Sequence, residues 1–240
     1  MGCEVEVGPD LLPVTLARDG AVLIQQGSVA EVRALLDRWT VPVDHPHQVI
    51  DGMTVIAPRL RSDDSDNEAG FTDLALSPHT DRSLHEQPPS VLATLMLAPA
   101  RDGGSATLVD GARVLALARR CASDAEIARL RLRTTSGRFG PPVVEFSPDH
   151  ARIRYRNDCI AHPYSTDGRT EPVAAVRRLI VEMTRSLRLR AGDGYLVHNH
   201  RFLHGRAAFA GDRRLVRFLA SVNSDHPYAW LNRGFSIASS

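Results

Sequence analysis

The chain has 240 residues, 43% of them hydrophobic and 24% charged, and its formal net charge is +1. These values are typical of one globular domain, and we expect a single domain over residues 1–240. The near-neutral charge argues against a nucleic-acid-binding protein, and no apolar run reaches the roughly 18 residues of a membrane span. The three cysteines fit neither a disulfide framework nor a CxxC metal site, so we expect a cytoplasmic protein with reduced thiols.

Short apolar segments separated by turn signals follow one another along the chain. The expected strands are residues 20–26, 90–100, 103–110, 143–147, 151–158, 193–209 and 213–222. Apolar residues at helical spacing predict helices over residues 28–39, 111–130 and 171–192, and the polar stretch 51–73 predicts a loop. Many short strands with few helices indicate a mainly β fold, an antiparallel β-sandwich or jelly roll with flanking helices.

A histidine and an aspartate stand two residues apart in the stretch LSPHTDRS, residues 76–83. On an extended segment His79 and Asp81 point to the same side, about 6 to 7 Å apart along the strand. Both can therefore bind one metal ion, but an imidazole and a carboxylate leave a divalent metal short of protein ligands. A third ligand is expected from a later strand.

The later stretch HNHRFLHGR offers three histidines, His198, His200 and His204. His204 is the best candidate, because Gly205 follows it and a glycine in a strand lets backbone or ligand come close. Two histidines and one carboxylate form the facial triad that binds non-haem Fe(II) and leaves positions open for co-substrate and oxygen. Five further histidines in loops and polar turns are expected to be solvated: His45, His47, His85, His150 and His226.

Three arginines follow His204 in the stretch DRRLVR, residues 212–217. Strand alternation puts Arg213, Leu215 and Arg217 on one face and Arg214 on the other. The adjacent strand contains no Asp or Glu to pair with them, and a guanidinium binds a carboxylate in bidentate fashion. The pattern indicates a dicarboxylate held near the metal.

Together these motifs resemble the Fe(II)/2-oxoglutarate-dependent dioxygenases of the taurine dioxygenase and clavaminate synthase-like family, over about residues 70–222. The resemblance implies a double-stranded β-helix (jelly-roll) core and a dioxygenase that binds Fe(II) and uses 2-oxoglutarate and O2 as co-substrates. Because Asp81 is present where halogenating relatives have a small residue, the resemblance implies hydroxylation, desaturation or oxidative ring closure rather than halogenation.

The resemblance also implies roles for individual residues. The metal-binding and catalytic residues that it implies are His79, Asp81 and His204. The residues that it implies for 2-oxoglutarate are Thr107, Arg213 and Arg217. Arg213 would hold the distal carboxylate, and Arg217 would lie near the metal-side carboxylate or an anionic part of the substrate.

The segment before the HxD motif is expected to form a lid loop, residues 57–73. It contains four crowded carboxylates: Asp63, Asp64, Asp66 and Glu68. They are either a solvated surface or a site for a small cationic substrate, such as an aminoglycoside-like sugar or a basic amino acid derivative. The second interpretation places the enzyme in natural-product or antibiotic biosynthesis. We expect a small-molecule substrate and no nucleic-acid or membrane partner, and the sequence does not indicate an oligomeric state.

Two other classes of protein remain open at this point. A zinc hydrolase can use the same three ligands with water in the open position, but it has no use for Thr107 and Arg213. A non-catalytic jelly-roll binding module would not need the metal at all. Succinate production from 2-oxoglutarate separates the dioxygenase from both.

Overall fold

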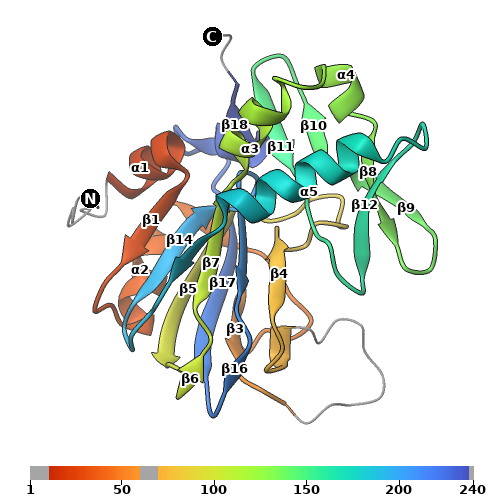
Figure 1. The fold of residues 1–240 in the computed structure, drawn as a ribbon. Helices are drawn as coiled ribbons and strands as arrows, with labels where there is room; N and C mark the ends of the chain where they lie inside the picture. Colours follow the sequence, from red (N-terminus) through yellow and green to blue (C-terminus); the bar gives the residue numbers. More distant parts are fainter. Residues whose placement is uncertain (1–10, 60–69, 238–240) are drawn as a thin grey trace.

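The computed structural model describes residues 11–59 and 70–237. Two antiparallel sheets form the centre of the molecule (Figure 1). The larger sheet has the order β1 (Ala21–Ile24), β14 (Gly194–His198), β5 (Val91–Ala98), β17 (Arg214–Val222) and β2 (Thr40–Pro42), and β3 (Met53–Ile56) also pairs with β17. The smaller sheet has the order β13 (Arg185–Leu187), β7 (Ala106–Asp110), β15 (Phe202–Arg206) and β4 (Leu76–His79). The predicted mainly β, jelly-roll class with flanking helices is confirmed.

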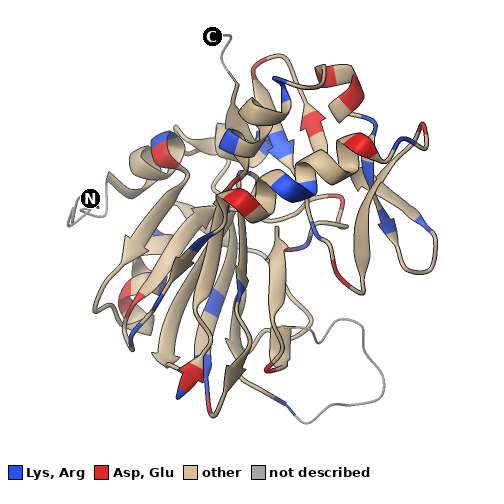
Figure 2. Cartoon of the chain, viewed as in Figure 1, with Lys and Arg blue, Asp and Glu red and all other residues tan. Residues whose placement is uncertain are grey.

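Apolar side chains from both sheets meet between them. Leu92, Val197 and Leu219 of the larger sheet pack with Ala106 and Leu108 of the smaller one, and all five are buried. The strands β5 and β14 carry no charged residue, whereas charges gather on the helices and on the outer hairpins (Figure 2). Burial of these apolar faces stabilises the sandwich and holds the strand ends that form the site.

Two short helices cover the other face of the larger sheet, α1 (Leu12–Asp19) and α2 (Val29–Asp37). Helix α2 begins with a capping box, in which the Ser28 hydroxyl accepts from Glu31 N–H and the Glu31 carboxylate accepts from Ser28 N–H. Its buried residues Val32 and Leu36 pack against β5 and β17 in one apolar cluster. No helix in the described part of the chain is long and apolar enough to span a membrane.

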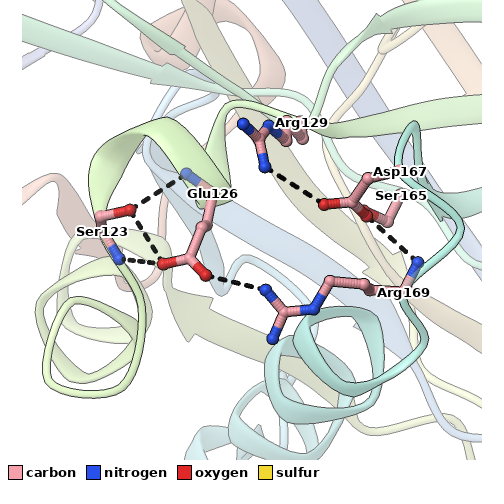
Figure 3. A network of polar contacts seen from close by, with 6 residues as sticks. All are labelled: Ser123, Glu126, Arg129, Ser165, Asp167 and Arg169. Atoms are coloured by element: carbon pink, nitrogen blue, oxygen red, sulfur yellow. Dashed lines mark hydrogen bonds and ion pairs between the residues drawn. The ribbon is translucent and has the colours of Figure 1, made fainter.

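A second group of elements lies beside the smaller sheet. Its helices are α3 (Gly111–Ala118), α4 (Asp124–Ile127) and α5 (Glu171–Met183), and its strands are β8 (Leu130–Thr134), β9 (Phe139–Pro142), β10 (Val144–Phe146), β11 (His150–Ile153), β12 (Ala161–Ser165) and β18 (Phe235–Ser236). Polar contacts tie α4 to the start of α5: Arg169 donates to Glu126, and the backbone N–H of Arg169 and the Ser165 hydroxyl both donate to Asp167 (Figure 3). The remaining elements are β6 (Asp102–Gly103), β16 (Phe209–Ala210) and the 3-10 helix η3 (Ala229–Arg233).

Several predicted elements differ from the observed ones at their ends. The helix predicted over residues 111–130 is two helices, because the Ser123 capping box starts α4 anew and a strand begins at Leu130. The helix predicted over residues 171–192 ends at Met183, and the chain then pairs with β7 as β13. The loop predicted over residues 51–73 contains β3, and the strand predicted over residues 151–158 leaves its sheet after Ile153. The predicted lid, residues 57–73, lies mostly outside the described residues.

Candidate active site

A cavity of about 350 Å³ is lined by residues of both sheets. His79 and His204 come from the smaller sheet, and Tyr195 comes from the larger one. The cavity lies where the predicted metal-binding motifs meet, so the fold brings together residues that are 125 positions apart in the chain.

The stretch that contains His79 and Asp81 is held by hydrogen bonds on both sides. His79 Nδ1 lies 2.9 Å from the carbonyl oxygen of Ser77, which leaves Nε2 free to face the cavity. The side chain of Asn199 binds the backbone of Asp81 twice, because Asp81 N–H donates to Oδ1 at 2.8 Å and Nδ2 donates to the Asp81 carbonyl at 3.0 Å. Strand β4 ends at His79, so Asp81 is positioned by this clamp in a turn, and not by strand alternation as predicted.

Strand pairing brings His204 to His79. The two residues are directly opposite in the β15–β4 ladder, and their ring centroids are 4.4 Å apart. His204 Nε2 lies 3.8 Å from Asp81 Oδ2. The following residue must be small, since a Cβ on Gly205 would lie 2.4 Å from the carbonyl oxygen of Leu76.

The charges of the site are set by burial and by Arg217. Burial alone would raise the pKa of Asp81, but the charge of Arg217, with smaller contributions from His204 and His79, holds it well below its usual range. Arg217 Nη1 lies 2.9 Å from Asp81 Oδ2 and 3.2 Å from Oδ1. Burial lowers the pKa of His204 to about 3 and also lowers that of His79. Both imidazoles are therefore neutral at pH 7, which is the form that binds a metal.

The donor set fits a divalent metal of the Fe(II) class: two neutral imidazoles and an ionised carboxylate on one wall of a cavity. Among residues 11–59 and 70–237, no three His, Cys, Asp or Glu side chains are already grouped as a metal-binding set. The Asp81 carboxylate contacts Arg217 and also lies 3.8 Å from His204 Nε2, so it faces both the guanidinium and the imidazoles.

The competing histidines His198 and His200 lie in the core. His198 Nε2 lies 2.9 Å from the carbonyl oxygen of Leu231, and His200 Nε2 lies 3.2 Å from that of Pro88. Each is 1% exposed, and neither lines the cavity. The structure therefore separates His204 from the two histidines that compete with it in the sequence.

The residues predicted for 2-oxoglutarate have different positions. Arg213 and Arg217 line the cavity, whereas Arg214 is exposed, as the strand alternation predicts. Arg213 is 4% exposed, its guanidinium lies over the Phe209 ring at 5.6 Å, and no carboxylate pairs with it among the described residues. Thr107 lies beside the cavity rather than on its wall, because its hydroxyl faces Gly205 on the next strand.

Sequence reasoning missed several residues of the cavity wall. Thr94 and Tyr195 are cross-strand neighbours that line it, and burial raises the pKa of Tyr195 to about 12. Three histidines predicted to be solvated also line the cavity: His45 and His47 are half-buried there, and His85 is exposed, as predicted. The alternation of β14 could have indicated Tyr195, but the histidines reach the cavity only through tertiary packing.

Three further arginines lie on the cavity wall. They are Arg82, Arg156 and Arg206. The four carboxylates predicted to bind substrate lie outside the described residues: Asp63, Asp64, Asp66 and Glu68.

Three solved structures illustrate the similarity of the fold. An asparagine oxygenase in complex with Fe(II), 2S,3S-3-hydroxyasparagine and succinate is 17% identical, with a TM-score of 0.63 over 86% of this chain and 77% of that chain. The non-heme iron oxygenase OrfP in complex with Fe, succinate and (3R,4R)-dihydroxy-L-Arg is 19% identical, with a TM-score of 0.65 over 92% and 82%. PvcB from Pseudomonas aeruginosa is 20% identical, with a TM-score of 0.64 over 89% and 80%.

A family model places the chain more firmly than these distant likenesses. The model described as "Taurine catabolism dioxygenase TauD, TfdA family" matches residues 14–219, which include every metal-binding and arginine motif discussed above. The predicted Fe(II) and 2-oxoglutarate agree with the iron, succinate and alpha-ketoglutarate named for the similar structures. The match confirms the predicted enzyme class, and the chain belongs to the TauD/TfdA family of dioxygenases.

Proposed function

We propose that this dioxygenase uses Fe(II) and 2-oxoglutarate to hydroxylate or oxidatively cyclise a small polar molecule that resembles an amino acid. One observation carries the proposal: His79, Asp81 and His204 line the same cavity as Arg213, a buried guanidinium without a carboxylate partner among the described residues. A metal-binding wall and a free buried cation together suit a metal-chelating dicarboxylate such as 2-oxoglutarate.

Each residue has a defined task in this mechanism. His79, His204 and Asp81 would hold Fe(II). When bound, Fe(II) would allow the enzyme to oxidise an unactivated C–H bond, with 2-oxoglutarate and O2 consumed as co-substrates. Arg213 holds the distal carboxylate of 2-oxoglutarate, and the ring of Phe209 supports its guanidinium. With Asp81 bound to Fe(II), the charge of that carboxylate would be shared with the metal, and Arg217 would be left to bind an anionic group of the substrate.

Arginines on the cavity wall favour a substrate that has a carboxylate. Arg82 and Arg217 both face the cavity, and Asp81 is the one acidic residue on its described wall. A basic amino acid derivative has a carboxylate that these arginines can bind, whereas an aminoglycoside-like sugar has none. Asparagine oxygenase and OrfP carry hydroxylated asparagine and arginine in their own structures, which supports the same choice and a role in natural-product or antibiotic biosynthesis.

Succinate formation tests the proposal. Purified enzyme with Fe(II), O2 and 2-oxoglutarate should form succinate, and a panel of free amino acids should include members that raise the rate. Replacement of Fe(II) by Zn(II) should abolish the reaction. Hydrolysis supported by Zn(II), without any succinate from Fe(II) and 2-oxoglutarate, would instead show a zinc hydrolase.

The acidic residues of the predicted lid are tested separately. If Asp63, Asp64 and Asp66 bind an amine or guanidinium of the substrate, the triple change to Asn should raise the KM for a basic substrate and remove part of its salt dependence. The KM for 2-oxoglutarate should stay the same. An unchanged KM for the basic substrate would show that these carboxylates are only a solvated surface.

A further inference from the structure

The described wall of the cavity is strongly cationic. Five arginines line it, Arg82, Arg156, Arg206, Arg213 and Arg217, against the single carboxylate of Asp81. Two of the five have partners away from the cavity wall: Arg156 forms an ion pair with Asp158 at 2.7 Å, and Arg206 donates to the carbonyl oxygens of Thr72 and Leu74. Arg213 is assigned to 2-oxoglutarate, so Arg82 and Arg217 are the two cations of the wall that are left to face the primary substrate.

Arg82 enters the cavity through an unusual backbone conformation. Its φ of 57° lies in the left-handed region, which residues with a Cβ rarely adopt. Contacts on both sides maintain it, because Asn199 clamps Asp81 and Arg154 donates to the carbonyl oxygens of His85 and Glu86. Strained residues of this kind persist only where their surroundings hold them, and they cluster at binding sites.

Arg82 and Arg217 lie close enough to affect one another. The charge of Arg217, after burial, contributes to the lowered pKa of Arg82, and both arginines contribute to the lowered pKa of His45. The hydrogen-bond partner of the Arg82 guanidinium among the described residues is neutral: Nη2 lies 3.1 Å from His85 Nδ1. Two guanidiniums therefore share one wall with Asp81, the single carboxylate of the described wall, which would also serve the metal.

We infer that Arg82 is a specificity-determining residue, which together with Arg217 forms an oxyanion site for a free carboxylate of the primary substrate. This inference rests on the proposed function and specifies its substrate class. Each guanidinium can bind a carboxylate in a planar, bidentate geometry, and the anion also relieves the repulsion between the two cations. A substrate whose carboxylate is an amide or a carrier-bound thioester lacks this charge, so the site selects the free acid.

Binding of matched acid and amide pairs tests the inference. Under anaerobic conditions, with Fe(II) and 2-oxoglutarate bound, calorimetry measures the affinity for L-arginine, L-asparagine and L-glutamine and for the α-amide of each. At least one acid should bind to the wild-type enzyme about tenfold or more tightly than its α-amide. Added salt should reduce this preference.

Three variants identify the residue responsible. Arg82→Asn removes the charge and suits the left-handed backbone, since asparagine adopts that region more readily than other non-glycine residues, and it should lower the acid-over-amide ratio about tenfold. Arg82→Lys keeps the charge and should retain part of the ratio. The exposed Arg178 of α5 provides a matched control, and Arg178→Asn should leave the ratio unchanged.

Succinate formation from 2-oxoglutarate in the absence of a primary substrate tests the dioxygenase function separately from the oxyanion site. The control Arg178→Asn should retain this uncoupled reaction at the wild-type rate, because Arg178 is exposed on α5 and outside the cavity. If the wild-type enzyme forms no succinate, the proposed function itself fails. If succinate forms, any one of three results would contradict the oxyanion site. These results are that no acid binds, that the amides bind as tightly as the acids, or that Arg82→Asn keeps the wild-type preference for the acid.

Discussion

Strands β14 and β15 and the turn between them carry two groups of histidines with opposite surroundings. His198 and His200 are each 1% exposed and have main-chain carbonyl partners in the core. His204, six residues beyond His198, lies against His79 on a cavity wall, 3.8 Å from the Asp81 carboxylate. The difference shows that a nearby carboxylate and an open cavity distinguish the candidate metal ligand from its neighbours.

Burial does not make this distinction. It lowers the pKa of His198 to about 4 and that of His204 to about 3, so both rings are neutral at pH 7. A neutral buried imidazole is required of a metal ligand, but it is equally common in a core. Substitutions should separate the core histidines from the histidines of the cavity wall by their effects on turnover and on stability.

The largest difference is expected in turnover. His79→Ala, Asp81→Ala and His204→Ala should each reduce succinate formation below detection with little change in fold, because each removes a metal ligand. His198→Ala should instead lower the free energy of unfolding by about 2 to 4 kcal/mol, since it leaves a cavity and an unpaired carbonyl in the core. Succinate assays and chemical denaturation measure the two effects. Normal turnover by His204→Ala would remove the distinction.

The next effect concerns 2-oxoglutarate. Arg213→Ala should raise the KM for 2-oxoglutarate about 10- to 100-fold, because a charge-assisted hydrogen bond contributes about 1.5 to 3 kcal/mol. The exposed neighbour Arg214 is the control, and Arg214→Ala should change this KM less than about twofold. Equal effects of the two changes would show that the inward face of β17 has been assigned wrongly.

A smaller effect is expected from the clamp on Asp81. Asn199→Ala should weaken Fe(II) binding about tenfold, because hydrogen bonds that orient a metal ligand typically contribute that much. Asn232 is a matched control, since it binds both backbone groups of Val222 but does not contact Asp81. Asn232→Ala should destabilise the protein without a change in iron affinity. The same iron affinity in both variants would contradict the clamp.

The smallest effect is a pH dependence of stability. The pKa of His198 is about 4 in the folded protein, below its ordinary value of 6.5, so the unfolded chain binds a proton that the folded chain does not between these values. Stability should therefore decrease as the pH falls through that window, by about 1 kcal/mol for this residue at about pH 5.5. Denaturation of the wild type and of His198→Gln should show a shallower decrease in the variant. Parallel curves would show that His198 is not buried in its neutral form.

The sequence predicted the strands that carry the site better than it predicted the helices. Strand alternation predicted that Arg213 and Arg217 face one way and Arg214 the other, and the first two line the cavity while Arg214 is exposed, although Arg213 precedes β17 by one residue. The helix predicted over residues 111–130 failed, because apolar spacing continues across a break that the Ser123 capping box makes. A local capping signal of that kind competes with periodicity, and the spacing of apolar residues alone does not reveal it.

The site was predictable where a motif is local and unpredictable where packing creates it. His79 and Asp81 are close in the chain, but the contact of Asp81 with Arg217 joins a turn to a strand 136 residues away. The positions of His45 and Arg82 on the cavity wall depend on tertiary packing and on one left-handed residue, which no periodic pattern reveals. Thr107, which was predicted from a family motif, lies beside the wall instead of on it.

Anaerobic titration with Fe(II) in the presence of 2-oxoglutarate tests the central claim most directly. The wild-type protein should bind one Fe(II) and develop the visible charge-transfer absorption of a metal chelated by 2-oxoglutarate. The variant His200→Ala should retain this absorption in its folded fraction, and His204→Ala should lose it. Loss of iron binding in His200→Ala but not in His204→Ala would contradict the assignment of the metal ligands.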